Sequence, residues 1–367
     1  AAAGDRRLTG RVGVPARRLE GWLELQQRAH PRSIDLGLER AGKVARSLGL
    51  ERARVPTFIV GGTNGKGSTV ALLDSMLRAA GIATGAFSSP HLVRYNERIH
   101  VGGAPVPDGE IVAAFEASER ARGATTLTYF EFSTLAALLV FHERAVGAQV
   151  LEVGVGLVLG HRAPRPLREQ PSGEVDDARL ADLGPDADQF VEATNLVDAD
   201  VAVLCSVGSD HHEWLGPTLE DIGREKAGIF RRGRPAIIAT PAMPASVFSE
   251  IGRIGAVAQV ARRAYDWRPR GARWDWWSAG RTLAGLPRPA LAGDTQFGNA
   301  AAAIAALDAS VFRVPHEAVA QGLAQVRLPG RFQVVPGEVE WILDVAHNVP
   351  AATELAHNLA ARPAQGR

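Results

Sequence analysis

A glycine-rich turn between an apolar run and a helical pattern constrains the fold of this chain most. Residues 57–60 predict a short buried strand, and residues 70–80 predict an amphipathic helix that ends at Gly81 as its C-cap. Glycines in the turn let backbone N–H groups converge on an anion, and the start of the helix adds partial positive charge. We therefore expect Lys66 to reach the outer phosphates of a nucleotide, and Ser68 or Thr69 to serve phosphate or metal.

The spacing of this turn departs from the common P-loop pattern. Val60 stands where that pattern has its first glycine, and Gly67 separates Lys66 from the hydroxyl residue. A tight strand-to-helix turn with an exposed lysine is the alternative. The gathering of glycines with Thr63, Asn64 and Ser68 favours phosphate binding over that alternative.

Composition limits the class of protein. A chain of 367 residues is long enough for two domains, and 46% hydrophobic with 22% charged residues is ordinary for a soluble globular protein. The formal net charge of +1 favours no polyanionic partner. The single cysteine, Cys205, excludes an internal disulfide framework and suits a reducing compartment. The sequence shows neither an apolar run long enough for a membrane span nor an apolar signal core at its start, so a cytoplasmic location is expected.

Strands and helices alternate along the first two thirds of the chain. Two helical patterns lie within residues 17–49, ahead of the glycine turn. Beyond it, strands are predicted at 82–87, 148–153, 201–207 and 236–239, and helices at 110–122, 130–146 and 219–230. This order predicts an α/β fold with a mostly parallel, P-loop-type sheet flanked by helices.

Polar side chains follow several of these strands. Ser88 and Ser89 come after the second strand, Glu152 ends the third, and Asp210 with His211 follows the fourth. The carboxyl ends of parallel strands are where such sheets bind ligands. An acid in an apolar strand costs several kcal/mol unless it is paired or binds a metal. The oxygen-rich set therefore suits Mg²⁺ carrying a nucleotide. The alternatives are an N-cap serine turn at 88–89 and a structural role for His211.

Other stretches carry weaker signals. Residues 154–160 resemble a dinucleotide fingerprint, but the third glycine is one residue late. Residues 157–190 have no sustained period and predict a long surface loop or a disordered insert. Residues 265–285 interleave tryptophan with arginine, which suits either base stacking or a small β-meander, and the near-zero net charge favours the meander.

The end of the chain predicts a second unit. Residues 286–296 resemble an interdomain linker, because they contain two prolines and two glycines. An Ala-rich helix follows over 300–307, then a strand over 339–345 and a last helix over 351–361. We divide the chain into an N-terminal ATP-binding unit, residues 1–288, and a smaller C-terminal unit, residues 289–367.

Several alternative chemistries lack their motifs. His142-Glu143 and His212-Glu213 both lack the second histidine of a His-Glu-x-x-His zinc site, and there is no cysteine pair. No Gly-x-Ser-x-Gly nucleophile turn occurs.

A set of motifs taken together is more specific. In order these are Gly62-Thr-Asn-Gly-Lys-Gly-Ser68, Ser88-Ser-Pro-His-Leu-Val-Arg-Tyr-Asn-Glu-Arg98, Leu151-Glu-Val-Gly154, Ala193-Thr-Asn195, Asp210-His211, Trp214-Leu-Gly216, Gly223-Arg-Glu-Lys-Ala-Gly-Ile-Phe230, Leu328-Pro-Gly-Arg-Phe-Gln333 and Asp344-Val-Ala-His-Asn348. From Ile34 to Asn348 the chain resembles the bifunctional bacterial dihydrofolate synthase/folylpolyglutamate synthases of the Mur ligase superfamily.

The resemblance implies an ATP- and Mg²⁺-dependent ligase. ATP would phosphorylate the carboxylate of dihydropteroate or of a folate γ-glutamyl group, and the amine of L-glutamate would then attack the acyl phosphate. Positioning and charge neutralisation carry most of such a phosphoryl transfer. A monomer without nucleic-acid or membrane partners is expected, with a partial, Rossmann-like C-terminal unit.

The resemblance also implies roles for individual residues. Lys66, Lys226 and His211 are expected to be catalytic, with Lys226 carbamylated; without the resemblance, Lys226 would be interpreted as an exposed helix lysine. The expected metal ligands are Ser89, Glu152 and His211. The nucleotide would be held by Thr63, Asn64, Gly65, Lys66, Gly67, Ser68, Asn299, Arg331 and Asp344. The pteroate-binding set would be Ile34, Asp35, Leu36, Gly37, Thr128, Tyr129, Phe130 and Glu131.

Two departures from the family pattern leave alternatives open. Roughly thirty-five residues intervene after Glu152-Val-Gly where the family has a short connection, and Glu192 replaces an expected Asp. The chain also ends after one strand and one helix beyond Arg331, so the C-terminal unit is expected to be incomplete. A cell-wall amino-acid ligase, or a nucleotide-binding protein with impaired turnover, are the alternative functions.

Overall fold

The central element of the fold is an eight-stranded sheet with the order β4-β3-β2-β5-β1-β6-β7-β8. The computed structural model describes residues 17–28, 38–50, 53–153, 196–209 and 215–362. Strands β2, β5, β1, β6, β7 and β8 run parallel, and the short β3 and β4 add an antiparallel edge. The strands are β1 Thr57–Gly61, β2 Thr84–Phe87, β3 Ile99–Val101, β4 Ala104–Pro105, β5 Ala148–Glu152, β6 Val201–Leu204, β7 Pro235–Ile238 and β8 Val257–Val260. The predicted mostly parallel sheet is confirmed.

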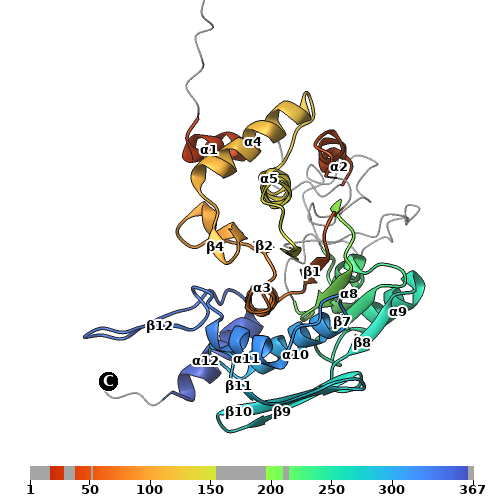
Figure 1. Ribbon diagram of the computed structural model, residues 1–367, viewed down its shortest axis with the longest axis vertical. Coiled ribbons are helices and arrows are strands. Elements are labelled where there is room, and N and C mark those ends of the chain that lie inside the picture. The colour runs from red at the N-terminus through yellow and green to blue at the C-terminus, as the bar shows by residue number, and fades with distance from the viewer. Residues whose placement is uncertain (1–16, 29–37, 51–52, 154–195, 210–214, 363–367) are drawn as a thin grey trace, which may run out of the picture.

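Helices cover both faces of this sheet (Figure 1). Along β1, Phe58 and Val60 belong to one hydrophobic core, and Ile59 belongs to the other. Strands buried on both faces are almost continuously apolar, which explains why residues 57–60 were recognisable as a strand.

One layer consists of α1 Leu19–Arg28, α2 Leu38–Ser47, α4 Asp108–Arg122 and α5 Tyr129–Glu143. Aromatic rings join α1, α4 and α5, because Phe115 lies 6.1 Å from Trp22 and 6.3 Å from Phe132 between ring centroids. The helix predicted over 219–230 is shorter: α8 covers Leu219–Lys226, and a 3-10 turn, Ala227–Ile229, follows. Helix α9, Ala245–Ile254, packs beside α8.

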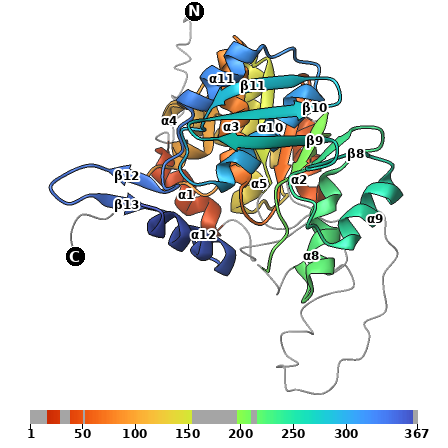
Figure 2. The same cartoon turned by 90° about the horizontal axis from the view of Figure 1, so that it is seen from below.

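The other layer consists of α3 Lys66–Ala79, α10 Thr295–Asp308 and α11 His316–Gln325. An antiparallel meander of β9 Tyr265–Arg270, β10 Arg273–Ser278 and β11 Thr282–Pro287 covers it (Figure 2). The predicted meander is confirmed. Trp274 and Trp276 are fully buried, and the Trp276 indole donates to the carbonyl of Ala301 at 3.1 Å. These two rings are therefore core residues rather than platforms for bases.

Helices α10 and α11 follow the predicted boundary at 289, yet both pack on α3 and share its hydrophobic core. Residues 288–294 therefore connect two elements of one core. The division at residue 289 stays a prediction.

The contact between α11 and α3 is especially close at Gly322. A Cβ added to Gly322 would lie 2.6 Å from the Cα of Met76, and the Ser75 hydroxyl donates to the Gly322 carbonyl at 2.9 Å. Helix α3 begins directly after the glycine-rich turn, so this contact helps to hold the turn in place.

Residues 327–362 include a hairpin and a helix. Strands β12 Gln333–Val335 and β13 Trp341–Leu343 pair antiparallel, and α12 covers Val349–Ala360. The hairpin projects from the rest of the molecule in Figure 2. The predicted strand at 339–345 and the helix at 351–361 are both present.

Several elements were not predicted, namely α9, α11, β3, β4, β8 and β12. Strands β3, β4 and β12 have only two or three residues each, too few for a periodic pattern. The two helices carried a usable signal: Val247 and Ile251 in α9, and Val319 and Leu323 in α11, are buried four residues apart. None of the helices within the described ranges is long and apolar enough to span a lipid bilayer.

Candidate nucleotide and metal site

Four neighbouring strands end at one edge of the sheet and bring several of the predicted site residues to that edge. The connection after β1, residues 62–65, is called the phosphate loop below. Ser88 and Ser89 follow β2, Glu152 ends β5, and Cys205 follows β6. Because β2, β5, β1 and β6 are adjacent and parallel, these segments share one edge.

Glycine is required at two positions of the phosphate loop. Gly62 has φ +139° and Gly65 has φ +88°. A Cβ at Gly62 would lie 2.9 Å from the Ser206 backbone nitrogen, and one at Gly65 would lie 2.7 Å from Oδ1 of Asn299. The loop therefore approaches both β6 and α10 too closely for any side chain.

Hydrogen bonds fix the phosphate loop to the residues after β6. The Thr63 amide donates to the Ser206 carbonyl at 2.9 Å, and the Gly208 amide donates to the Thr63 hydroxyl at 2.9 Å. The Ser206 hydroxyl accepts from the Asn64 amide at 2.9 Å and donates to the Asn64 carbonyl at 3.0 Å. Sequence reasoning missed Ser206, because the predicted strand at 201–207 included it, whereas β6 ends at Leu204.

The first turn of α3 is arranged to receive an anion. The helix begins at Lys66, its first backbone bond runs from the Thr69 amide to the Gly65 carbonyl at 3.0 Å, and its N-cap Gly65 has no side chain to accept the earlier amides. Such amides bind phosphate readily. Thr69 is fully buried and donates to the Gly65 carbonyl at 2.9 Å, so Ser68 is the better candidate of the two hydroxyls.

Two lysines meet at the carbonyl of Gly62. The Lys66 ammonium donates to this oxygen at 2.9 Å and to the Thr63 carbonyl at 3.0 Å, while the Lys226 ammonium lies 3.5 Å from the Gly62 oxygen. Lys226 is only 3% exposed, so its interpretation as an exposed helix lysine is wrong. Two neighbouring cations in one enclosed place suit a site for negative charge.

Glu152 is the acidic member of this site. It is 3% exposed, and its Oε2 has no hydrogen-bond partner within the described residues. Burial raises the pKa of Glu152, while Lys66, Arg331 and a backbone hydrogen bond from Ser89 oppose that rise. A buried carboxylate oxygen without a partner fits a divalent cation.

Residues from the later part of the chain reach the same place. A Cβ added to Gly67 would lie 3.4 Å from Oε2 of Glu152 and 3.7 Å from Nη2 of Arg331. Asn299 contacts the loop at Gly65. Asp344 accepts from the amides of Phe332 at 2.7 Å and Ala346 at 2.8 Å, and so supports the segment that carries Arg331.

The arrangement resembles that of known ligases in sequence and in structure. The chain is 42% identical over 351 residues to the dihydrofolate synthase/folylpolyglutamate synthase of Escherichia coli K12, covering 95% of this chain and 74% of that protein. The Haemophilus influenzae protein of the same name is 34% identical over 361 residues, covering 94% and 74%. The chain belongs to the dihydrofolate synthase/folylpolyglutamate synthase family. The resemblance seen in the sequence motifs is thereby confirmed, although no protein-family profile matches the chain.

Solved structures of this family agree with the fold. The E. coli FolC structure in complex with DHPP and ADP has a TM-score of 0.83 and 41% identity, covering 96% of this chain and 76% of that one. The Yersinia pestis bifunctional folylpolyglutamate synthase/dihydrofolate synthase, complexed with AMPPNP and a Mn ion, has a TM-score of 0.80 and 39% identity, covering 94% and 75%.

The predicted pteroate segment at 128–131 has two structural side chains. Thr128 and Glu131 form a capping box at the start of α5, with bonds of 3.2 Å and 2.7 Å, and Glu131 also pairs with Arg40 at 3.1 Å. The Arg98 guanidinium carbon lies over the Tyr129 ring, 5.4 Å from the ring centroid. The ring centroids of Phe130 and Phe87 are 5.8 Å apart. In this ligase family member, Tyr129 and Phe130 are therefore the better candidates for substrate contact.

Part of the predicted site lies outside the described residues. This holds for the metal candidate His211 with Asp210, for the pteroate candidates Ile34, Asp35, Leu36 and Gly37, and for the predicted insert at 157–190. Within the described residues, no three His, Cys, Asp or Glu side chains come together as a metal-binding group. Ser89 and Glu152 are the described members of the predicted metal set.

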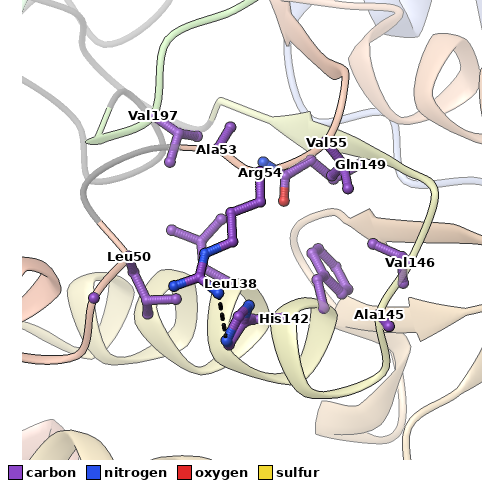
Figure 3. Close-up of a pocket in the computed structure, with 12 residues that line it drawn as sticks. Leu50, Ala53, Arg54, Val55, Leu138, His142, Ala145, Val146, Gln149 and Val197 are labelled. Carbon is purple, nitrogen blue, oxygen red and sulfur yellow. Dashed lines mark hydrogen bonds between the residues drawn. The ribbon is translucent and has the colours of Figure 1, made fainter.

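A cavity of about 270 Å³ lies at the opposite edge of the sheet (Figure 3). It is lined mainly by apolar side chains near the starts of β1 and β5, including Val55, Leu138 and Val146. Arg54 extends across it, and its Nη1 lies 3.4 Å from Nε2 of His142. None of the predicted site residues lines this cavity, so it is separate from the nucleotide site.

Proposed function

We propose that this chain is an ATP-dependent ligase that adds L-glutamate to dihydropteroate, to the γ-carboxylate of tetrahydrofolate, or to both. Its family consists of ligases of this kind. Members have been solved with DHPP and ADP, and with Mn, AMPPNP and L-glutamate. ATP and a divalent metal are therefore its cofactors.

The observation that carries the proposal is the convergence of Lys66, Glu152 and Arg331 around Gly67. The first-turn amides of α3 would hold phosphate oxygens, and Lys66 would exchange its two carbonyl partners for them. Asn299 on α10 and Arg331 before β12 would also contact the nucleotide.

Glu152 and Ser89 would hold Mg²⁺, with His211 as the third expected ligand. When bound, the metal neutralises phosphate charge as the phosphoryl group moves to the substrate carboxylate. Lys226 lies within reach of the same loop, which supports a role in the site whether or not it is carbamylated.

Phosphate release from ATP tests this function. We expect release only when Mg²⁺, a pteroate or folate acceptor and L-glutamate are all present. Lys66→Met should abolish it, because the ammonium group over the loop is lost. Lys43→Met is the matched control, since Lys43 is exposed on α2. ATP binding without glutamate-dependent release would instead support the nucleotide-binding protein without turnover.

We also propose a cytoplasmic monomer without a nucleic-acid partner. The single cysteine suits a reducing compartment, and the net charge of +1 gives no general attraction to polyanions. Light scattering after size-exclusion chromatography measures the oligomeric state, and a dimer mass would contradict this part of the proposal.

A further inference from the structure

Asn348, at the start of α12, reaches back to the phosphate loop. Its Nδ2 donates to Oδ1 of Asn64 at 3.2 Å, and Nδ2 of Asn64 donates to Oδ1 of Asn348 at 3.1 Å. We infer that Asn348 is a positioning residue that turns the Asn64 carboxamide so that its N–H faces the nucleotide phosphates. This inference rests on the proposed binding of a nucleotide at the phosphate loop.

The orientation of Asn348 is set by α12. Asn348 is the N-cap of this helix, and its Oδ1 also accepts from the Ala351 amide at 3.1 Å. A helix start leaves backbone amides that need an acceptor, and only the oxygen of a carboxamide can accept. Oδ1 of Asn348 must therefore face both Ala351 and the Nδ2 of Asn64.

This orientation determines what Asn64 offers to a ligand. The Asn64 backbone is already held by Ser206 through bonds of 2.9 Å and 3.0 Å, so the remaining freedom lies in its side chain. Pairing with Asn348 uses the carbonyl oxygen and one N–H of the Asn64 carboxamide, and leaves the second N–H for another acceptor. A reversed carboxamide would present its oxygen to phosphate oxygens, which is repulsive.

The pair also joins two distant parts of the chain. In the ranges that the structure describes, no other hydrogen bond connects residues 327–362 to the phosphate loop. Pro350 lies close by, 3.8 Å from a Cβ added to Gly208. The start of α12 thus lies against the phosphate loop.

Three variants separate positioning from helix capping. Asn348→Ser keeps an N-cap oxygen but is too short to pair with Asn64. Asn348→Asp keeps the cap and the acceptor, but it loses the donor and adds negative charge. Asn358→Ser, in the same helix, is the control. The probe is the non-hydrolysable analogue AMPPNP with Mg²⁺, and its Kd is measured by calorimetry.

We expect Asn348→Ser to raise the Kd roughly three- to tenfold, the worth of one net hydrogen bond. Asn348→Asp should raise it further at low salt, and Asn358→Ser should leave it unchanged. Asn64→Ala combined with Asn348→Ser should bind no more weakly than Asn64→Ala alone, because both remove the same contact. If Asn348 only capped α12, Asn348→Ser would bind like the wild type, which would overturn the inference. Full additivity with Asn64→Ala would also overturn it.

The wild-type protein distinguishes this inference from the proposed function. If it binds AMPPNP but shows no glutamate-dependent phosphate release, the ligase function fails while the Kd comparison still decides the role of Asn348. Failure of the wild type to bind AMPPNP overturns both.

Discussion

Two glycines at opposite ends of α3 allow the contribution of the phosphate loop to nucleotide binding to be measured, with one glycine as the control for the other. Gly65 precedes the helix with φ +88°, and Gly81 follows it with φ +79°. A side chain in this left-handed conformation costs about 1–2 kcal/mol at either position. We therefore expect Gly65→Ala and Gly81→Ala to lose similar amounts of unfolding free energy from backbone strain.

Only the change at Gly65 should affect nucleotide binding. A Cβ there would lie 2.7 Å from Oδ1 of Asn299 and 3.4 Å from the Cβ of Cys205, whereas one at Gly81 meets nothing within 4 Å. Asn299 would have to move away from the loop, and we expect it to lose the contact with the nucleotide that is proposed above. One unmade hydrogen bond of this kind costs about 1–3 kcal/mol, which corresponds to a roughly 5- to 150-fold higher Kd.

Calorimetry with AMPPNP and Mg²⁺ measures the binding, and urea unfolding of both variants measures the strain. If Gly65→Ala binds within twofold of the wild type, the closeness of Asn299 to the phosphate loop has no bearing on the nucleotide. If Gly81→Ala weakens binding equally, distortion of α3 rather than displacement of Asn299 is the cause.

Two further predictions concern stability. Gly322→Ala should lower the unfolding free energy by about 1–3 kcal/mol, because its Cβ would meet the Met76 backbone at 2.6–2.7 Å. The control Gly252→Ala has open space around it in α9 and should raise the unfolding free energy by up to about 1 kcal/mol. Equal melting temperatures of the two variants would refute the close packing at Gly322. Burial raises the pKa of Glu152 above its ordinary value of 4.5, so the ligand-free fold loses stability as the pH rises above that value. Glu152→Gln should therefore be more stable than the wild type at pH 8 and equal to it near pH 4, while its glutamate-dependent phosphate release is lost. A variant less stable than the wild type at pH 8 would show that Glu152 is stabilised by its neighbours in the empty site.

The sheet and the site edge could be predicted because their signals are local. Residues 57–69 carry a strand, a turn and a helix start within one short window. Glu152 was recognisable because a single acid at the end of an apolar strand needs a partner. The parallel character of the sheet then followed from the alternation of strands and helices, whereas the order of the strands was not predicted.

Contacts between distant segments could not be predicted in this way. Asn64 and Asn348 are 284 positions apart, and no periodicity links them. The spacing Thr128-x-x-Glu131 carried the signature of a capping box, yet the resemblance to the family assigned both residues to substrate. The resemblance alone did not show that two of these side chains bind each other at the start of α5.

The charges of the site explain why these contacts are needed. Lys66 and Lys226 share one carbonyl oxygen, Arg331 lies across Gly67, and Glu152 opposes them as a buried carboxylate with an unpaired oxygen. The unpaired carboxylate oxygen of Glu152 costs stability in the ligand-free protein, because a buried polar group without a partner is unfavourable. The hydrogen bonds from Ser206 and Asn348 to the phosphate loop hold the loop in place despite that cost. We expect a nucleotide with its metal to bring phosphate charge to Lys66 and Arg331 and a cation to Glu152. We therefore expect the site to prefer a metal-bound triphosphate to a free anion, because groups of both charges lie around the phosphate loop.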